Sequence, residues 1–292
     1  MGSYHPESPL RLRAVEDQLI ASGLINYLDH LDAPSADRVH LERVHTRGYV
    51  DSIFAAVPKA GICHLDPDTA MNPFSLRAAL RAAGAVVYAV DIVMSGRTKT
   101  AFCSVRPPGH HAERERAMGF CFFNNVAVGA AHALEQYRLK RVCIADFDVH
   151  HGNGTEDIFR FDPRVLMVST FQHPFYPYSG ADTRSETMVN IPLPAYTGGE
   201  RFRKAVTDNW VPALDAFRPQ LIIVSAGFDA HRDDDMASLS LVESDYAWIT
   251  SLLLDMAAKY SEGRIVSVLE GGYELHALGR SVMTHLKVLS GL

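Results

Sequence analysis

The sequence has few cysteines and no long apolar run. None of its four cysteines forms a Cys-x-x-Cys pair, so neither a disulfide framework nor a thiolate zinc site is expected. Apolar segments such as residues 81–94 are too short and too interrupted to span a bilayer, and the first residues do not form a signal peptide. These absences predict a cytoplasmic protein with no membrane partner.

Blocks of positive charge are also missing. The chain has 28 Lys and Arg residues against 34 Asp and Glu residues, and its net charge of -6 argues against a nucleic-acid partner. No internal repeat, low-complexity tract or composition break divides the 292 residues, and 47% hydrophobic content can fill one large core. We therefore expect a single domain over residues 1–292.

Short β-branched runs alternate with longer segments of helical periodicity. This alternation predicts an α/β fold with a mainly parallel sheet. The expected strands cover residues 100–105, 141–146, 164–170, 220–227 and 264–272. The expected helices cover residues 76–95, 123–137, 200–217 and 242–260.

Four of these strands run directly into loops that contain His, Asp or Tyr. The loops read RPPGHHAE, FDVHHGNG, FDAHRDDD and GGY. In open α/β sheets, ligands bind beyond the carboxyl ends of the strands, so the four loops are expected to meet at one site. A single Asp-x-Asp after a strand is as often only a helix cap. Four such loops make a shared site the better interpretation.

The spacing of the second loop is suited to metal binding. In an extended chain, residues two apart share a side, so Asp148 and His150 can reach one ion while Phe147 and Val149 pack inward. Asp229 from the third loop would complete a set of three ligands with open positions, as catalytic zinc sites require.

Such a site also needs a general base. Two carboxylates formally neutralise a divalent cation, so its water should be less acidic than at a site of three neutral histidines. The adjacent His110 and His111 are the candidates, since imidazole titrates near neutral pH. Alone, such a pair would more often be a surface loop or a satisfied polar cluster.

Five ordered motifs, RPPGHH, GFCFFNN, DFDVHHGNGT, SAGFDAH and LEGGY, resemble the zinc-dependent histone deacetylase family. The likeness runs from HPESPLR at residues 5–11 to beyond Tyr273. The particular versions of the motifs in this chain resemble those of class II or bacterial histone deacetylase-like amidohydrolases. It implies the three-layer arginase/deacetylase fold, with Tyr273 polarising the scissile carbonyl. It also implies a zinc ion on Asp148, His150 and Asp229, although Fe2+ or Co2+ would suit the same donors.

The resemblance further implies partners for the histidine pair. His110 is paired with Asp146, and His111 with Asn153, where class I members have an aspartate. An aspartate favours imidazolium, whereas an asparagine orients a ring without adding charge. We therefore predict that His110 is the charged electrostatic partner and His111 the neutral base.

A narrow tunnel for an acyl-lysine chain is also implied by the family likeness. The Gly-Gly pair before Tyr273 is expected to let the phenol close over substrate, although a simple tight turn would explain it as well. The expected substrate-contacting residues are Gly119, Phe120, Tyr176, Met236, Gly271 and Gly272.

Monovalent cations, usually potassium, are a further implication of the resemblance. The matching positions are Asp146, Asp148, His150, Ser169 and Thr170 for one ion, and Phe159, Asp162 and Val165 for another. Relatives usually have a short strand before the HPE motif, and this chain starts almost at it, so either the sequence is truncated there or the edge of the sheet is arranged differently.

Three functions follow from these residues. Hydrolysis of N6-acyl-lysine amides in proteins or peptides is the first, and acetylpolyamine hydrolysis by the same machinery is the second. A non-catalytic module that binds acylated ligands is the third, and the complete catalytic set disfavours it. The acidic run 233–235 would attract a polyamine or a lysine-rich peptide, or is simply a solvated loop.

Overall fold

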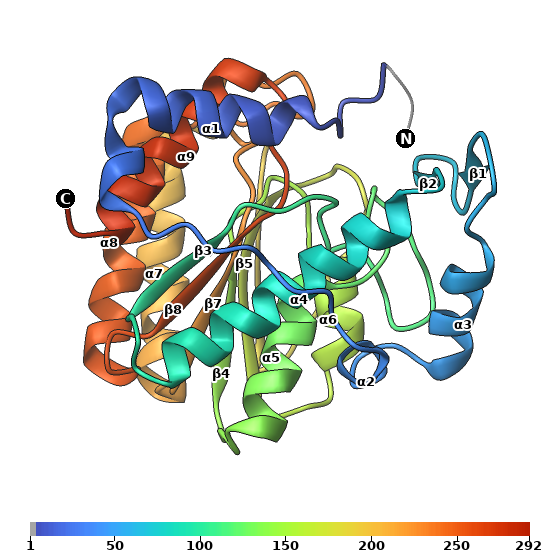
Figure 1. Ribbon diagram of the computed structural model, residues 1–292. Helices are drawn as coiled ribbons and strands as arrows, with labels where there is room; N and C mark the ends of the chain where they lie inside the picture. Colours follow the sequence, from blue (N-terminus) through green and yellow to red (C-terminus); the bar gives the residue numbers. More distant parts are fainter. Residues whose placement is uncertain (1–3) are drawn as a thin grey trace.

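A parallel sheet forms the centre of the protein. The structure is a computed structural model that describes residues 4–292, and within them the main sheet has six strands (Figure 1). Their order is β3-β8-β7-β4-β5-β6, and every neighbouring pair is parallel. The strands are β3 (Thr100–Cys103), β4 (Val142–Asp146), β5 (Val165–Gln172), β6 (Met188–Leu193), β7 (Leu221–Ala226) and β8 (Ile265–Leu269).

Helices cover both faces of this sheet (Figure 1). Successive side chains of β4 point to opposite faces, so Val142 and Ile144 join one apolar core while Cys143 and Ala145 join the other. The first core contains α4 (Ser75–Met94) and α5 (Asn125–Gln136); the second contains α1 (Leu10–Ser22), α7 (Gly199–Phe217), α8 (Glu243–Tyr260) and α9 (Leu275–Leu289). The predicted α/β fold is thus confirmed.

Smaller elements complete the described chain. They are the 3-10 turn η1 (Leu24–Tyr27), α2 (Arg38–Leu41), α3 (Arg47–Ala55), the strand pair β1 (Cys63–His64) and β2 (Ala70–Met71), and α6 (Asn153–Phe159). None of the helices in residues 4–292 combines the length and hydropathy needed to cross a membrane.

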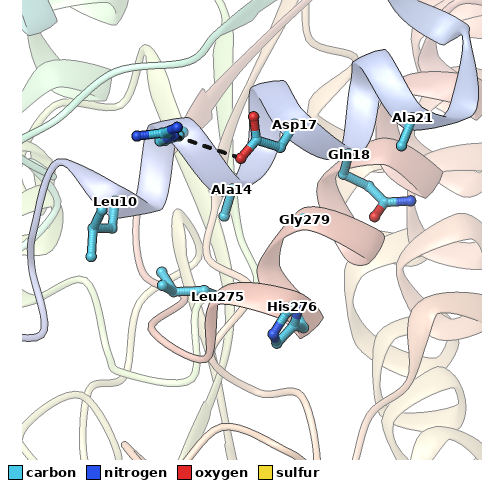
Figure 2. Close-up of a pocket in the computed structure, with 9 residues that line it drawn as sticks. Leu10, Ala14, Asp17, Gln18, Ala21, Leu275, His276 and Gly279 are labelled. Carbon is cyan, nitrogen blue, oxygen red and sulfur yellow. Dashed lines mark ion pairs between the residues drawn. The ribbon is translucent and has the colours of Figure 1, made fainter.

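Three of the larger elements, α1, α9 and β6, are absent from the sequence-based prediction. β6 has the sequence MVNIPL and lies at the edge of the sheet, where a proline such as Pro192 is tolerated. α1 and α9 lie side by side and are bordered by a groove of about 570 Å³ (Figure 2). A Cβ atom on Gly279 would lie 2.8 Å from the carbonyl oxygen of Ala14, so the glycine permits this close contact.

Candidate active site

The three predicted metal ligands lie together at the carboxyl end of the sheet. One ligand-type atom from each of Asp148, His150 and Asp229 lies within 4.8 Å of the others. His150 Nδ1 is 3.1 Å from Asp148 Oδ1 and 3.2 Å from Asp229 Oδ2. All three residues are buried.

Backbone hydrogen bonds tie the loops of this cluster to one another. The Asp148 N–H donates to Asp146 Oδ1 at 3.1 Å, and the Val149 N–H donates to Asp229 Oδ1 at 3.0 Å. The Gly271 N–H donates to Asp148 Oδ2 at 2.8 Å. Loops after β4, β7 and β8 therefore fix the carboxylates from three directions.

The donor atoms suit a divalent cation. Asp229 Oδ2 is buried and lies 3.2 Å from His150 Nδ1, but within residues 4–292 no contact to this oxygen has the geometry of a hydrogen bond. Burial and the charge of Asp148 raise the pKa of the Asp229 carboxyl to about 6. The site thus offers two buried carboxylates and one imidazole, and one carboxylate oxygen has no hydrogen bond. Zinc, ferrous and cobalt ions all bind such a set of ligands.

The histidine pair stands beside this cluster, with ring centroids 4.1 Å apart. His110 Nδ1–H donates to Asp146 Oδ2 at 3.0 Å, and His111 Nδ1–H donates to Asn153 Oδ1 at 2.7 Å. The structure therefore brings each histidine to the partner that the sequence predicted for it.

The pKa values of the two rings are shifted in opposite directions. Burial opposes a charge on His110, but the carboxylates of Asp148 and Asp146 outweigh it and raise the pKa of His110 to about 10. Burial, together with the charges of His110 and His150, lowers the pKa of His111 well below 6.5. This asymmetry agrees with a charged His110 and a neutral His111.

Tyr273 lies on the loop between β8 and α9, the loop that also contains Gly271. Its ring meets the ring of Phe120 edge-on at 5.8 Å, and the Arg11 guanidinium lies 4.8 Å from its centroid. Arg11 donates to the carbonyl of Gly272 at 2.6 Å and to that of Glu270. Burial raises the pKa of the Tyr273 phenol well above 10, so the phenol keeps its proton.

The two glycines before Tyr273 have a steric role. A Cβ atom on Gly271 would lie 2.0 Å from Asp229 Oδ2 and 2.6 Å from Asp148 Oδ2, so only glycine lets the backbone approach these carboxylates. Gly272 has a φ of +121°, which side chains rarely tolerate. The loop is held by close contacts, whereas the sequence suggested freedom to close over substrate.

Tyr176 lies beside the histidines, whereas Phe120 lies against the ring of Tyr273. The Tyr176 ring lies 5.3 Å from that of His111 and 6.1 Å from that of His150, in both cases edge-on. Gly119 lies against the ring of His111, because a Cβ atom there would be 2.3 Å from His111 Cδ2.

The acidic run near Met236 is largely engaged within the protein. Asp234 is only 4% exposed, and its Oδ1 accepts the Met236 N–H at 3.0 Å. Asp233 pairs with Arg280 at 3.2 Å. Asp235 is exposed. The run is therefore not the uniformly solvated loop that its sequence allowed.

The first predicted potassium site contains oxygens that need a partner. Asp146 pairs in register with Ser169 on the neighbouring strand. The hydroxyls of Ser169 and Thr170 are buried, and nothing in the described chain forms a hydrogen bond with them. Ser169 and Thr170 are consecutive residues of β5 and point to opposite faces, so one ion could be bound by the Ser169 hydroxyl beside Asp146 but not also by the hydroxyl of Thr170.

The second predicted potassium site is already bonded internally. The Asp162 N–H donates to the carbonyl of Phe159, and the Val165 N–H donates to that of Asp162. The Asp162 carboxylate also binds Arg164 at 2.7 Å. The carbonyls of Phe159 and Asp162 thus each accept a hydrogen bond, and the Asp162 carboxylate is paired.

Three residues at this site were missed by sequence reasoning. Phe175 stacks on His150 with centroids 5.6 Å apart, and the neighbouring Tyr176 was the only signal for it. Arg11 lies 261 residues from the carbonyl that it binds. Asp234 Oδ2 accepts the N–H groups of Tyr273 at 2.6 Å and Glu274 at 2.9 Å. Arg11 and Asp234 both form hydrogen bonds with backbone atoms. Such contacts do not depend on the type of the partner residue, so no sequence pattern indicates them.

Known proteins resemble this chain over nearly all its length. A family model described as "Histone deacetylase domain" matches residues 5–289. The chain is 38% identical to the histone deacetylase-like amidohydrolase of Pseudomonas aeruginosa, covering 92% of this chain and 72% of that protein. It is 36% identical to a probable deacetylase of Archaeoglobus fulgidus, covering 99% and 81% of the two.

Longer relatives and a solved structure show the same likeness. The chain spans 20% of the Type-2 histone deacetylase 2 of Dictyostelium discoideum, at 34% identity and 98% coverage of this chain. The crystal structure of the HDA15 HD domain superposes with a TM-score of 0.92 at 34% identity, covering 100% of this chain and 85% of the other. The chain therefore belongs to the histone deacetylase family and is a hydrolase of that type.

Proposed function

We propose that the protein hydrolyses N6-acetyl- or N6-acyl-lysine amides in proteins or peptides, with zinc as its metal. The observation that carries this proposal is the buried group Asp148, His150 and Asp229 beside the unequal pair His110 and His111. Metal ligands, a base and a protonated phenol are the components of metal-assisted amide hydrolysis.

The histidines would divide the proton transfers. A divalent metal on the three ligands would polarise the acyl oxygen and acidify a water molecule. His111, whose Nδ1–H is held by Asn153, is free to accept the proton of the attacking water at Nε2. His110, charged beside Asp146, favours the negative charge that develops nearby, and the pair then protonates the departing amine.

Tyr273 would stabilise the acyl oxygen. Its phenol keeps its proton and donates a hydrogen bond that strengthens as charge grows on that oxygen. Phe120 and Tyr176 would flank the aliphatic stem of the substrate and exclude water around the reacting amide. Met236 and Gly119 would contribute to the same channel.

The acidic run supports lysine peptides over polyamines. A polyamine enzyme would need a carboxylate free to pair with the distal ammonium; Asp234 is buried and Asp233 binds Arg280, which leaves only the exposed Asp235 of this run for that role. The deciding experiment compares kcat/KM for an acetyl-lysine peptide, acetylputrescine and acetylspermidine. The peptide should be preferred; a clear preference for either acetylpolyamine would replace the proposal with polyamine deacetylation.

The native ions can be tested directly. We propose zinc for the three-ligand site and potassium for a site beside Asp146 that includes the buried Ser169 hydroxyl, which needs a partner. Metal analysis of protein purified without added metal should return about one zinc per chain. Predominant iron or cobalt would reassign the metal while leaving the ligand set in place.

A further inference from the structure

A third residue continues the chain of hydrogen bonds behind His111. Asn153 Oδ1 accepts from His111 Nδ1 at 2.7 Å, and Asn153 Nδ2 donates to Glu113 Oε1 at 2.7 Å. The same amide nitrogen lies 3.3 Å from Met118 Sδ, an acceptor for its other hydrogen. His111 and Asn153 are buried, while Glu113 is half-buried.

The two ends of an asparagine amide have opposite hydrogen-bonding roles. Its oxygen only accepts and its nitrogen only donates, and the two ends are similar in size. If the nitrogen faced His111, it would donate to Nδ1, and the neutral ring would carry its proton on Nε2 instead. The ring would then present a proton where the mechanism needs a lone pair.

Glu113 is the nearest of three acceptors around the Asn153 nitrogen, since Met118 Sδ lies at 3.3 Å and the His111 carbonyl at 3.5 Å. An ionised carboxylate is only an acceptor, so it binds the Asn153 nitrogen and turns the oxygen toward His111. His111 must then donate from Nδ1, which leaves the lone pair on Nε2. The effect operates through orientation and needs no change in the charge of His111.

The backbone of Glu113 is itself fixed. Its N–H donates to the carbonyl of Arg116 at 2.9 Å, and its carbonyl lies 2.9 Å from His45 Nδ1. His45 Nε2 accepts the Asn124 N–H at 3.0 Å, so Nδ1 must be the protonated nitrogen and the donor. The carboxylate is therefore attached to a rigid segment, as a positioning group requires.

We propose that Glu113 is a positioning residue that orients the Asn153 amide and thereby holds His111 in the tautomer with a basic Nε2. The role in turnover rests on the proposed function. The role in selecting the tautomer depends only on the three side chains and can be observed without substrate.

Charge reversal at Glu113 provides the test, performed on the metal-loaded enzyme. In Glu113→Lys, the ammonium should bind Asn153 Oδ1 and turn the nitrogen toward His111. We expect kcat to fall by roughly 10²-fold, the lower range for losing a general base, with KM changed less than threefold. Glu113→Gln keeps an acceptor oxygen and should lose less than Glu113→Lys.

A second substitution should restore the function. In the double variant Glu113→Lys with Asn153→Asp, the new carboxylate can accept from both the lysine and His111 Nδ1, so kcat should recover at least tenfold over Glu113→Lys. Glu115→Lys makes the same charge change on the same loop at an exposed position, and it serves as the matched control.

Nitrogen NMR of histidine-labelled protein gives a readout independent of turnover. The His111 signals should change from the Nδ1–H to the Nε2–H pattern in Glu113→Lys, return in the double variant, and stay unchanged in Glu115→Lys. An unchanged tautomer in folded Glu113→Lys would overturn the proposal, as would a double variant no better than the single one. If the wild-type protein does not hydrolyse acyl-lysine, the proposed function is wrong. The tautomer signals of His111 still test the positioning role of Glu113 in that case.

Discussion

Two buried histidine sites in this protein have contrasting surroundings. His285 lies in the core between α8, α9 and β8, with Nδ1 2.6 Å from the Thr250 hydroxyl and Nε2 2.8 Å from the Ser267 hydroxyl. Burial alone lowers the pKa of His285 to about 3. His110, equally buried, donates to Asp146, and neighbouring carboxylates raise its pKa to about 10.

The contrast shows that the partners of a buried histidine decide its charge. Thr250 donates its own proton to the carbonyl of Tyr246, so it accepts from His285, and both ring nitrogens are satisfied without any charge. The active site instead gathers carboxylates and leaves Asp229 Oδ2 without a hydrogen bond in residues 4–292. We expect changes at the first site to alter stability, and changes at the second to alter catalysis.

The largest effect should come from the metal ligands. Asp148→Ala or Asp229→Ala removes one of three protein ligands, so the bound metal and the activity should disappear together while the fold persists. Metal analysis, circular dichroism and turnover measure the three properties. Full metal occupancy in both variants would show that the ion binds elsewhere.

Tyr273→Phe should have the next largest effect. It removes the phenol hydrogen bond but keeps the ring against Phe120, so kcat should fall by roughly 10² to 10³-fold with metal content and stability unchanged. Wild-type turnover in this variant would exclude the phenol from the mechanism.

Asp234→Asn tests how Tyr273 is held. The asparagine would direct a donor or a weaker acceptor at the N–H groups of Tyr273 and Glu274, so the loop should shift and kcat should fall by roughly 10 to 10²-fold. Asp235→Asn changes an exposed neighbour and is the matched control at saturating substrate. Equal kcat values for the two variants would contradict the positioning role of Asp234.

His285→Gln should affect stability without affecting turnover. It disrupts a buried hydrogen-bonded group, so the free energy of unfolding at pH 7 should fall by about 1 to 3 kcal/mol while kcat stays at the wild-type value. Denaturant unfolding and steady-state kinetics measure the two quantities. A larger loss of turnover than of stability would place His285 in the catalytic machinery.

The pH dependence of stability should reflect the protonation of His285. Unfolded His285 takes up a proton below about pH 6.5, whereas the folded residue does so only near pH 3, so its contribution is complete above pH 6.5 and is lost as the pH falls. Wild-type protein should therefore lose stability between pH 7 and pH 5 more steeply than His285→Gln. The exposed His64→Gln should keep the wild-type slope.

The smallest effect is expected at the exposed acidic side chain. Asp235→Asn should lower kcat/KM for cationic peptides only modestly, and the difference should shrink as salt rises, since such attraction is screened over about 8 to 10 Å. A large loss that persists at high salt and affects only acetylpolyamines would instead indicate a direct ion pair and favour polyamine hydrolysis.

The sequence predicts the features that depend on nearby residues. The strand-to-loop transitions at Asp146 and Ala226 follow from local patterns, and the motifs place Asp148 and His150 two residues apart. The prediction lacks β6, an edge strand that contains a proline, and the contacts of Arg11; it also lacks α9, although the apolar residues of α9 recur with a clear helical period. Those contacts depend on packing between segments that are distant in the chain.

The support of the Tyr273 loop has a consequence for protein synthesis. Arg11, near one end of the chain, binds the carbonyls of Glu270 and Gly272, near the other. Glu7 lies between Arg11 at 3.6 Å and Arg106 at 2.6 Å, so this early segment is also fastened to the middle of the chain. During synthesis, the Tyr273 loop can therefore reach its folded position only after Arg11 has met a segment that is made 261 residues later.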